Sequence, residues 1–547
     1  MKKFSKILSV ALLVALVLSL GVANAFAEEP AATATPKTHT ITNSTAGHTY
    51  EVYQIFRGDY DAETDQLQNL VYGTNAKGED GKPVSIEDIQ KLADYVDAGS
   101  TNALDQKDIA FVEQFVTLSN PVATLETGDT ETVAEGYYLI KDVDNSLDGT
   151  NEQYTLYLIN VLKDNITITP KTSTTTHDKK VDDKNDSNTN EDGTTWQDSA
   201  DYDIGDYVPY QLTAHMASNV NAFKKYHLTF TDTLEAGCFD AITTPVIKVN
   251  GVEISEVTGF NATVDYTTAA TKTGFAVTIT FTPIAPATLL PAELNGKDVT
   301  IDFSAQLGTG ANIGQVGNVN TSTLKYSNNP NSSDDHEEGE TPEDTVIVFT
   351  YDLVVNKQDQ DKKPLTGATF SLYKKYVTVP TDKTEATEIK YDSDKKTYEI
   401  PTDTHYVKVG TIAGTAASEF TFSGIDDGEY LLVEDVAPTG YNAIAPQTFT
   451  VTATHTTTAE VDKATKKDAN GAYVLTSVSG AGNSITLAQH TKAADNTIDG
   501  VSTDIINQSG TQLPSTGGIG TTIFYVVGGV LVLAAIILLV TKKRMSE

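Results

Sequence analysis

A lysine lies on the apolar face of a predicted strand in the second half of this 547-residue chain. In the segment LVVNKQD, strand alternation places Leu353, Val355 and Lys357 on one face, which the aliphatic residues predict to point inward. A buried amine loses hydration, and this loss favours its neutral, nucleophilic form. Asn507, at the end of the same region, shares a strand face with Ile505. The pattern predicts that a reactive amine and a side-chain amide both face the interior of a β-rich domain.

A motif between these two positions suggests what they do. The segment YLLVEDVAPTGY, from Tyr430 to Tyr441, resembles the E-box of Gram-positive pilins, YxLxExxAPxGY. The resemblance implies a spontaneous isopeptide bond between Lys357 and Asn507, with Glu434 as the assisting acid. A protonated Glu434 would polarise the amide carbonyl, the amine would attack, and ammonia would leave, with proximity contributing about 7–11 kcal/mol. The plainer alternative is a buried ion pair between Lys357 and Glu434, with Asn507 as a turn residue.

The middle of the chain resembles the middle domain of major pilins, in which the assisting acid is an aspartate. The matching segments are DKKV at 178–181, LTFTDTL at 228–234 and NVNTSTLKYSNNP at 318–330. The resemblance implies a second isopeptide bond between Lys179 and Asn320, assisted by Asp232. Lys180 and Asn318 remain alternatives for the two bonded residues. The plainer reading is that all of these are solvated residues of turns and strands.

A further lysine, Lys171, lies in the segment NVLKDNITITPKT at 160–172, which resembles the pilin motif ending in V-x-V-Y-P-K-N. In that family the motif lysine is the amine that accepts the sortase-bound subunit. Thr169 and Thr172 depart from the motif, so a surface lysine without this role is the alternative. Pro170 keeps the preceding residue extended, which favours exposure of Lys171.

The C-terminal region combines three features in order. The pentapeptide Leu513-Pro514-Ser515-Thr516-Gly517 is followed by an apolar run at 519–540 and then by Lys542-Lys543-Arg544. The apolar run is long enough to span a bilayer, and the basic cluster predicts a cytoplasmic end. The arrangement resembles the LPxTG sorting signal at 513–547, which implies that a sortase cleaves between Thr516 and Gly517. A plain single-pass anchor is the alternative.

The N-terminal region is typical of an export signal. Three lysines precede an apolar run at 7–22, and small residues around Ala27 indicate a cleavage site. Residues 1–27 are therefore predicted to be a signal peptide. The protein is expected to be secreted and then attached covalently to a Gram-positive cell wall, on a surface pilus.

The exported part reads as mainly β, because short runs rich in Thr, Val and Tyr alternate with Gly, Asn and Asp turns. We expect three tandem immunoglobulin-like β-sandwich domains of the collagen-adhesin type, at 39–171, 173–345 and 346–512, with polar joints between them. Short helices are expected in the first domain, one of them from Ser85 to Val96, where serine caps a helical apolar pattern.

Composition excludes several functions. The chain has 74 acidic and 38 basic residues and a formal charge of −36, which argues against nucleic-acid binding. The sequence contains no recognisable catalytic constellation, so the chain is not expected to be an enzyme or to need a cofactor. Residues 188–193 begin like a calcium loop, but Ser199 stands where the loop requires a glutamate, so no metal site is predicted.

These features together predict a shaft-forming pilin, with Thr516 of one subunit joined to Lys171 of the next. The expected partners are sortase, identical subunits arranged head to tail, minor pilins and peptidoglycan. The rival interpretations are a monomeric wall-anchored adhesin for a host matrix protein or glycan, and a minor pilin at the base or tip.

Overall fold

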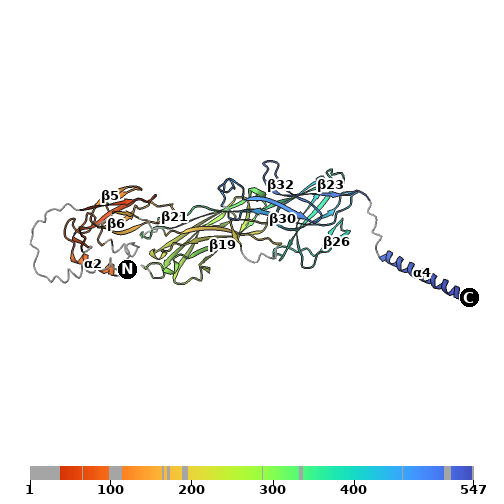
Figure 1. Ribbon diagram of the computed structural model, residues 1–547, viewed down its shortest axis with the longest axis horizontal. Coiled ribbons are helices and arrows are strands. Elements are labelled where there is room, and N and C mark those ends of the chain that lie inside the picture. The colour runs from red at the N-terminus through yellow and green to blue at the C-terminus, as the bar shows by residue number, and fades with distance from the viewer. Residues whose placement is uncertain are drawn as a thin grey trace, which may run out of the picture.

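The computed structural model describes residues 37–63, 66–97, 112, 114–162, 165–168, 173–187, 195–285, 288–331, 337–458, 460–510 and 519–544. It is an elongated row of three β-rich regions, with a single helix beyond the last of them (Figure 1). The predicted mainly β architecture is confirmed. The predicted signal peptide at 1–27 lies outside the described residues.

The N-terminal region contains two sheets and two apolar clusters, one of which is formed by residues of both sheets. The larger sheet has the order β3-β2-β6-β7, with β4 paired to β2; its strands are β2 (Tyr50–Asp61), β3 (Gln66–Tyr72), β4 (Ala123–Leu125), β6 (Gly136–Asp142) and β7 (Leu156–Val161). The smaller sheet has the order β5-β1-β8, formed by β1 (Thr38–Asn43), β5 (Thr130–Ala134) and β8 (Ile166–Ile168).

A helix follows the first three strands, as the sequence predicts. Helix α2 runs from Ile86 to Asp97, and Ser85 Oγ accepts a hydrogen bond of 3.1 Å from the backbone N–H of Asp88. This bond satisfies one of the free donors at the helix N-terminus. The predicted cap is therefore confirmed.

The middle region is a sandwich of two seven-stranded sheets around one large apolar core. The first sheet comprises β9 (Thr176–Asp182), β10 (Trp196–Gln197), β12 (Tyr207–His215), β14 (Phe239–Ile242), β15 (Val246–Val249), β16 (Val252–Glu253) and β19 (Asp298–Leu307). The second comprises β11 (Ser199–Asp201), β13 (Tyr226–Leu234), β17 (Phe260–Thr271), β18 (Gly274–Pro283), β20 (Asn318–Ser327), β21 (Glu338–Glu340) and β22 (Asp344–Phe349).

The C-terminal region packs a four-stranded sheet against a five-stranded sheet. The first has the order β28-β23-β33-β32, formed by β23 (Tyr351–Asp359), β28 (Glu419–Ile425), β32 (Leu487–Thr491) and β33 (Ile498–Asn507). The second has the order β27-β24-β29-β30-β31, formed by β24 (Ala368–Tyr376), β27 (His405–Gly414), β29 (Gly428–Val436), β30 (Gln447–His455) and β31 (Leu475–Gly482). A small hairpin joins β25 (Ile389–Tyr391) to β26 (Lys396–Tyr398).

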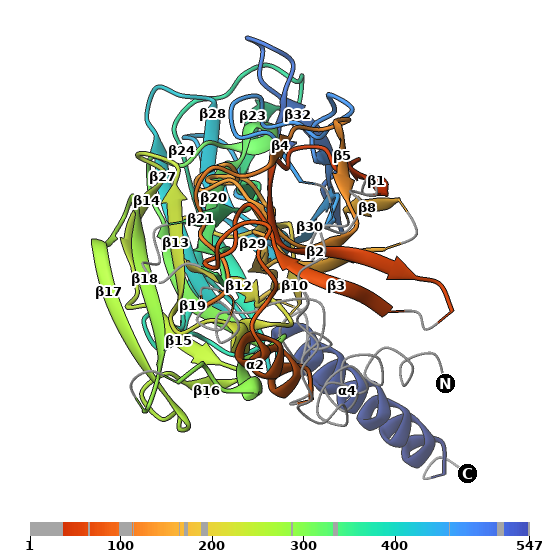
Figure 2. The same ribbon diagram turned by 90° about the vertical axis from the view of Figure 1, so that its left-hand side faces the viewer.

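The junction between the middle and C-terminal regions consists of two consecutive strands. Strand β22 continues to Phe349, beyond the expected boundary at 345, because it pairs with β20 in the middle-region sheet. Only Thr350, which is fully buried, separates β22 from β23. The two regions are therefore joined directly through consecutive strands. Viewed along the row, their sheets overlap (Figure 2).

Helix α4 runs from Ile519 to Arg544 and stands apart from the β regions (Figure 1). Its segment Tyr525–Lys542 is long and apolar enough to cross a membrane. The helix covers the apolar run predicted at 519–540.

Candidate functional site

Two neighbouring strands of the C-terminal domain bring Lys357 and Asn507 together. Strand β23 runs parallel to β33, with Lys357 opposite Ile505 and Asp359 opposite Asn507. Lys357 and Asn507 are therefore diagonal neighbours on the inner face, and both side chains are buried. The ammonium nitrogen of Lys357 lies 3.0 Å from the Ile505 carbonyl oxygen, to which it donates a hydrogen bond.

The third group comes from the opposing sheet. Glu434, on β29, has no exposed surface and accepts a hydrogen bond of 2.8 Å at Oε1 from Nδ2 of Asn507. Its other oxygen accepts a bond of 2.9 Å from the backbone N–H of Ile444. Asn507 Oδ1 is buried without a hydrogen-bond partner. A half-turn of this amide would exchange its two atoms and place the carbonyl oxygen against Glu434.

Burial moves both titratable groups toward their neutral forms. Loss of hydration lowers the pKa of Lys357 to about 8, although the carboxyl of Glu434 opposes the shift. Burial likewise raises the pKa of Glu434, against the opposing effects of its hydrogen bonds and of Lys357. A neutral amine next to a protonated acid and a primary amide is the starting state that amide exchange needs.

The middle domain contains a second set of the same composition. Lys179 on β9 contacts Asp232 on β13 across the sandwich, through its ammonium nitrogen and the carboxylate Oδ2. Strand β13 pairs with β20, placing Leu234 opposite Asn320 and Asp232 two residues away on the same face. All three polar residues are buried. Neither side-chain amide atom of Asn320 forms a hydrogen bond of good geometry, although the amide interacts with the carboxyl group of Asp232.

The surroundings of the second set are apolar. The ammonium nitrogen of Lys179 lies 5.4 Å from the ring centre of Tyr210 and 5.6 Å from that of Phe303. Burial lowers the pKa of Lys179 even though Asp232 attracts the charge. Burial also raises the pKa of Asp232, against the effect of Lys179. The same preference for neutral forms therefore holds in both domains.

The two alternative residues lie in different environments. Lys180 points away from the core and forms ion pairs of 2.6 Å with Asp198 and 3.0 Å with Asp178. The Asn318 amide group is occupied by the backbone: its Nδ2 donates to Asn312 and Val348, and its Oδ1 accepts from the N–H of Asn312. Lys179 and Asn320 are thus the pair that faces Asp232.

Two predicted sites fall outside the described residues. Lys171, with the flanking Thr169 and Thr172, follows β8 directly in sequence but is not described. The sorting residues Leu513, Pro514, Ser515, Thr516 and Gly517 lie between the end of the C-terminal domain and α4 and are likewise not described. Their roles remain predictions from the sequence.

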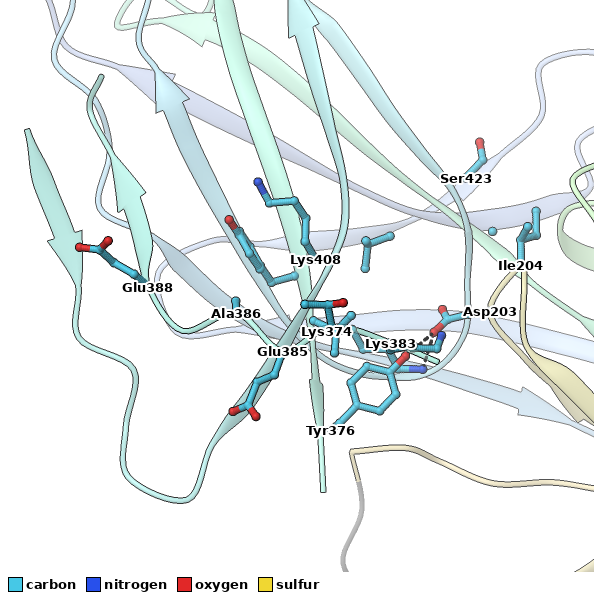
Figure 3. A pocket seen from close by; sticks show the side chains of 15 residues that line it. Asp203, Ile204, Lys374, Tyr376, Lys383, Glu385, Ala386, Glu388, Lys408 and Ser423 are labelled. Atoms are coloured by element: carbon cyan, nitrogen blue, oxygen red, sulfur yellow. Dashed lines mark hydrogen bonds and ion pairs between the residues drawn. The ribbon is translucent and has the colours of Figure 1, made fainter. Parts of the chain in front are cut away.

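A third buried lysine was not predicted from the sequence. Lys374 on β24 forms ion pairs with Asp186 (2.9 Å), Asp203 (2.8 Å) and Asp426 (2.5 Å). It lines a cavity of about 680 Å³ at the junction of the middle and C-terminal domains, where it points toward Asp203 beside Tyr376 (Figure 3). Strand alternation with Phe370 and Leu372 was the available signal, since the same argument identified Lys357.

Lys374 differs electrostatically from the other two buried lysines. Burial opposes its charge, but the carboxylates of Asp203 and Asp426 outweigh this effect and raise its pKa well above the ordinary value. Lys374 therefore remains an ammonium ion. We interpret this cluster as a structural ion network between domains.

Two protein families match the regions that contain the E-box segment and the sorting signal. The prealbumin-like fold domain named SpaA matches residues 351–467, and the LPXTG cell wall anchor motif matches residues 505–547. The trypsin-resistant surface T6 protein of Streptococcus pyogenes serotype M6 is 27% identical over 296 residues, covering 46% of this chain and 50% of the relative. The match thus spans about half the length of that protein.

Solved structures of similar chains cover most of the length. The T6 backbone pilin of serotype M6 Streptococcus pyogenes is 16% identical, with a TM-score of 0.42, and the match covers 87% of this chain and 93% of that one. The full-length major pilin SpaD of Corynebacterium diphtheriae is 15% identical, with a TM-score of 0.40 and coverages of 87% and 98%.

The predicted wall anchor and the pilin resemblance are confirmed by these matches, which join a structural domain to an anchoring signal. The chain is therefore identified as a protein that carries an LPXTG cell-wall anchor and a prealbumin-like SpaA domain and that is similar in sequence to the T6 surface protein.

Proposed function

We propose that the chain is the shaft subunit of a covalently polymerised pilus, stabilised by one isopeptide bond in its middle domain and one in its C-terminal domain. The observation that carries this proposal is the buried grouping of Lys357, Glu434 and Asn507 in the C-terminal domain. The anchor match adds sortase and peptidoglycan as partners.

In the C-terminal domain, the neutral amine of Lys357 attacks Cγ of Asn507. A new C–N bond forms as the bond to Nδ2 breaks, and that nitrogen leaves as ammonia. Glu434 shuttles the proton from the attacking amine to the leaving nitrogen, which is the atom hydrogen-bonded to it at 2.8 Å. The enclosed site suits this reaction because a dry, preformed arrangement keeps both groups neutral and close.

In the middle domain, Lys179 and Asn320 react in the same way with Asp232 as the acid. The contact between the Lys179 nitrogen and Asp232 allows direct proton transfer. The interaction of the Asn320 amide with the carboxyl group of Asp232 supports this assignment, because it places the acid beside the group that it would polarise.

The alternative of plain ion pairs is disfavoured by comparison with Lys374. That lysine has three carboxylates within 2.9 Å and keeps its charge. Lys357 has Glu434 and Asp359 nearby, and Lys179 has Asp232 and Asp344, yet the pKa of each lysine is lowered. These carboxyl groups do not offset the loss of hydration in the two sites, so an ammonium ion is not the favoured form.

The positions of the two bonds suit a fibre under tension. In the C-terminal domain, β23 is the first strand and β33 the last, and Lys357 and Asn507 join them directly. A force applied through the two ends of this domain passes along those strands and across the bond. The remaining sheets are then relieved of the load, so the domain resists unfolding.

Assembly requires two further residues. Sortase cleaves after Thr516 and transfers its carbonyl group to the amine of Lys171 on the next subunit. This contact uses different surfaces on the two subunits and does not close on itself, so it builds a fibre rather than a ring.

Immunoblotting of cell-wall extracts tests this function in cells that make a pilus-class sortase. We expect a ladder of high-mass bands in the parent strain. A single wall-linked band would instead support the monomeric adhesin. Incorporation of the protein only into ladders of another subunit would support a minor pilin.

A further inference from the structure

Two acidic side chains and a histidine meet where the middle and C-terminal domains join. Asp183 follows β9, Asp201 ends β11, and His455 ends β30 of the C-terminal domain. One side-chain ligand atom from each lies within 4.8 Å of the others. The backbone N–H of Asp198 donates a bond of 2.8 Å to the Thr457 carbonyl, so the two domains are in direct contact here.

The hydrogen bonds of His455 indicate which ring nitrogen carries the proton. The Ser199 hydroxyl donates its one hydrogen to the Thr456 carbonyl at 3.0 Å, so it accepts at 2.7 Å from Nδ1–H of His455. The lone pair is then on Nε2, which lies 3.8 Å from Oδ2 of Asp183, too far for a hydrogen bond. The side chain is 9% exposed.

This arrangement is the one that metal-binding histidines adopt, with one nitrogen held by a neighbour and the other directed into the site. The ring therefore supplies a lone pair where two carboxylates already face each other.

The carboxyl group of Asp201 is buried, and its Oδ2 lacks a well-formed hydrogen bond, although the carboxyl group interacts with the Tyr351 hydroxyl. The neighbouring cluster at Asp203 contains Lys374 as its cation. Among the described residues, Asp201 forms no ion pair with a lysine or arginine, and the charge of Lys374 acts on it without direct contact.

We propose that Asp183, Asp201 and His455 bind one divalent transition-metal cation of the zinc type, which joins the middle and C-terminal domains. Two carboxylate oxygens and one imidazole nitrogen suit zinc, with a fourth position for water. Calcium is disfavoured because it prefers oxygen ligands alone. Tetrahedral zinc holds its ligand atoms roughly 3.3 Å apart, so small inward rotations of these side chains complete the site. The proposed ion would link the two domains within one subunit, so this proposal does not depend on polymerisation of the chain.

Calorimetric titration of ZnCl2 into the mature chain, freed of metal by a chelator and carrying no added histidines, tests the proposal. We expect one zinc ion per chain, with binding weakened at least tenfold in Asp201→Asn and in His455→Gln. His405→Gln is the matched control, because that histidine is 41% exposed and pairs with the exposed Glu385. It should leave binding unchanged.

Cobalt(II) provides an independent readout, because its visible absorption reports tetrahedral nitrogen and oxygen ligands. The band should appear in the parent chain and in His405→Gln and be absent in His455→Gln. Circular dichroism identifies any variant that fails to fold. If one of the two site variants is unfolded, zinc binding by the other site variant tests the proposal. Absence of zinc binding in the parent chain, equal binding in both folded site variants, or tighter binding of calcium than zinc would each overturn the proposal.

Discussion

Asn507 donates a hydrogen bond of 2.8 Å from its side-chain nitrogen to Oε1 of Glu434 inside the C-terminal domain. The two residues lie on opposite sheets of the sandwich, and neither has exposed surface. The contact directs the leaving nitrogen of the proposed reaction at the acid that protonates it.

Glu434→Ala should leave Lys357 and Asn507 unlinked, because no other acid in the described part of the chain forms a hydrogen bond with the Asn507 amide. Intact-mass spectrometry should then show the mass of one ammonia restored relative to the parent chain, which we expect to lack two. Glu429→Ala on the same strand is the control, since its side chain is exposed and paired with Lys375. A parent chain of full mass would refute the crosslinks altogether.

Asp232→Ala should abolish the middle-domain bond and leave the C-terminal bond intact. Peptide mapping of the parent chain should find Lys179 joined to Asn320, because these are the residues that face Asp232. Lys180→Ala should retain the bond. A mapped bond through Lys180 or Asn318 would contradict the assignment, and four unmodified residues would remove this bond from the proposal.

Lys357→Met should lower the stability of the C-terminal domain, since methionine keeps the volume of the side chain but cannot form the bond. Lys357 and Asn507 are roughly 150 residues apart in sequence, and closing such a loop restricts the unfolded chain by about 5 kcal/mol. Thermal unfolding and trypsin digestion should both show the loss. Lys363→Met, at an exposed position, should match the parent. An unchanged midpoint in Lys357→Met would contradict a stabilising bond.

Asn507→Ala leaves the Lys357 amine free and should make stability depend on alkaline pH. The folded pKa is about 8 and the ordinary value is 10.5, so the unfolded chain binds more protons between these values. Stability should therefore rise as pH increases from about 8 to 10.5. Denaturant titrations across this range measure the effect. The double variant Lys357→Met/Asn507→Ala should lack it, and the parent should also lack it because its nitrogen is an amide.

Lys171→Arg should stop polymerisation, because a guanidinium group stays protonated and cannot act as the nucleophile. The protein should appear as a wall-linked monomer on immunoblots, with both internal bonds present by mass. A ladder that persists would show that another lysine accepts the subunit. Lys163→Arg then becomes the next variant, since Lys163 is the nearest upstream lysine in the same segment.

Several features followed from the sequence because they depend on local patterns. Alternation along one strand identified Lys357 as inward-facing, and its side chain is buried. The cap at Ser85 and the apolar run of α4 likewise depend on neighbouring residues. The E-box and the sorting signal are contiguous motifs, so their recognition needs no knowledge of the fold. The same argument from strand alternation identifies Lys374 on β24 as inward-facing.

Tertiary structure decided which distant residues meet and whether each buried lysine keeps its charge. Asp232 faces Lys179 and Asn320 because of how β9, β13 and β20 pair and stack, and strand register between distant segments is not encoded in any short window. Lys374 is an ammonium ion because Asp186 and Asp203 approach it from the neighbouring domain. The sequence of a strand predicts that a lysine is buried, but the carboxylates that the fold places around it determine whether it remains charged or becomes a nucleophile.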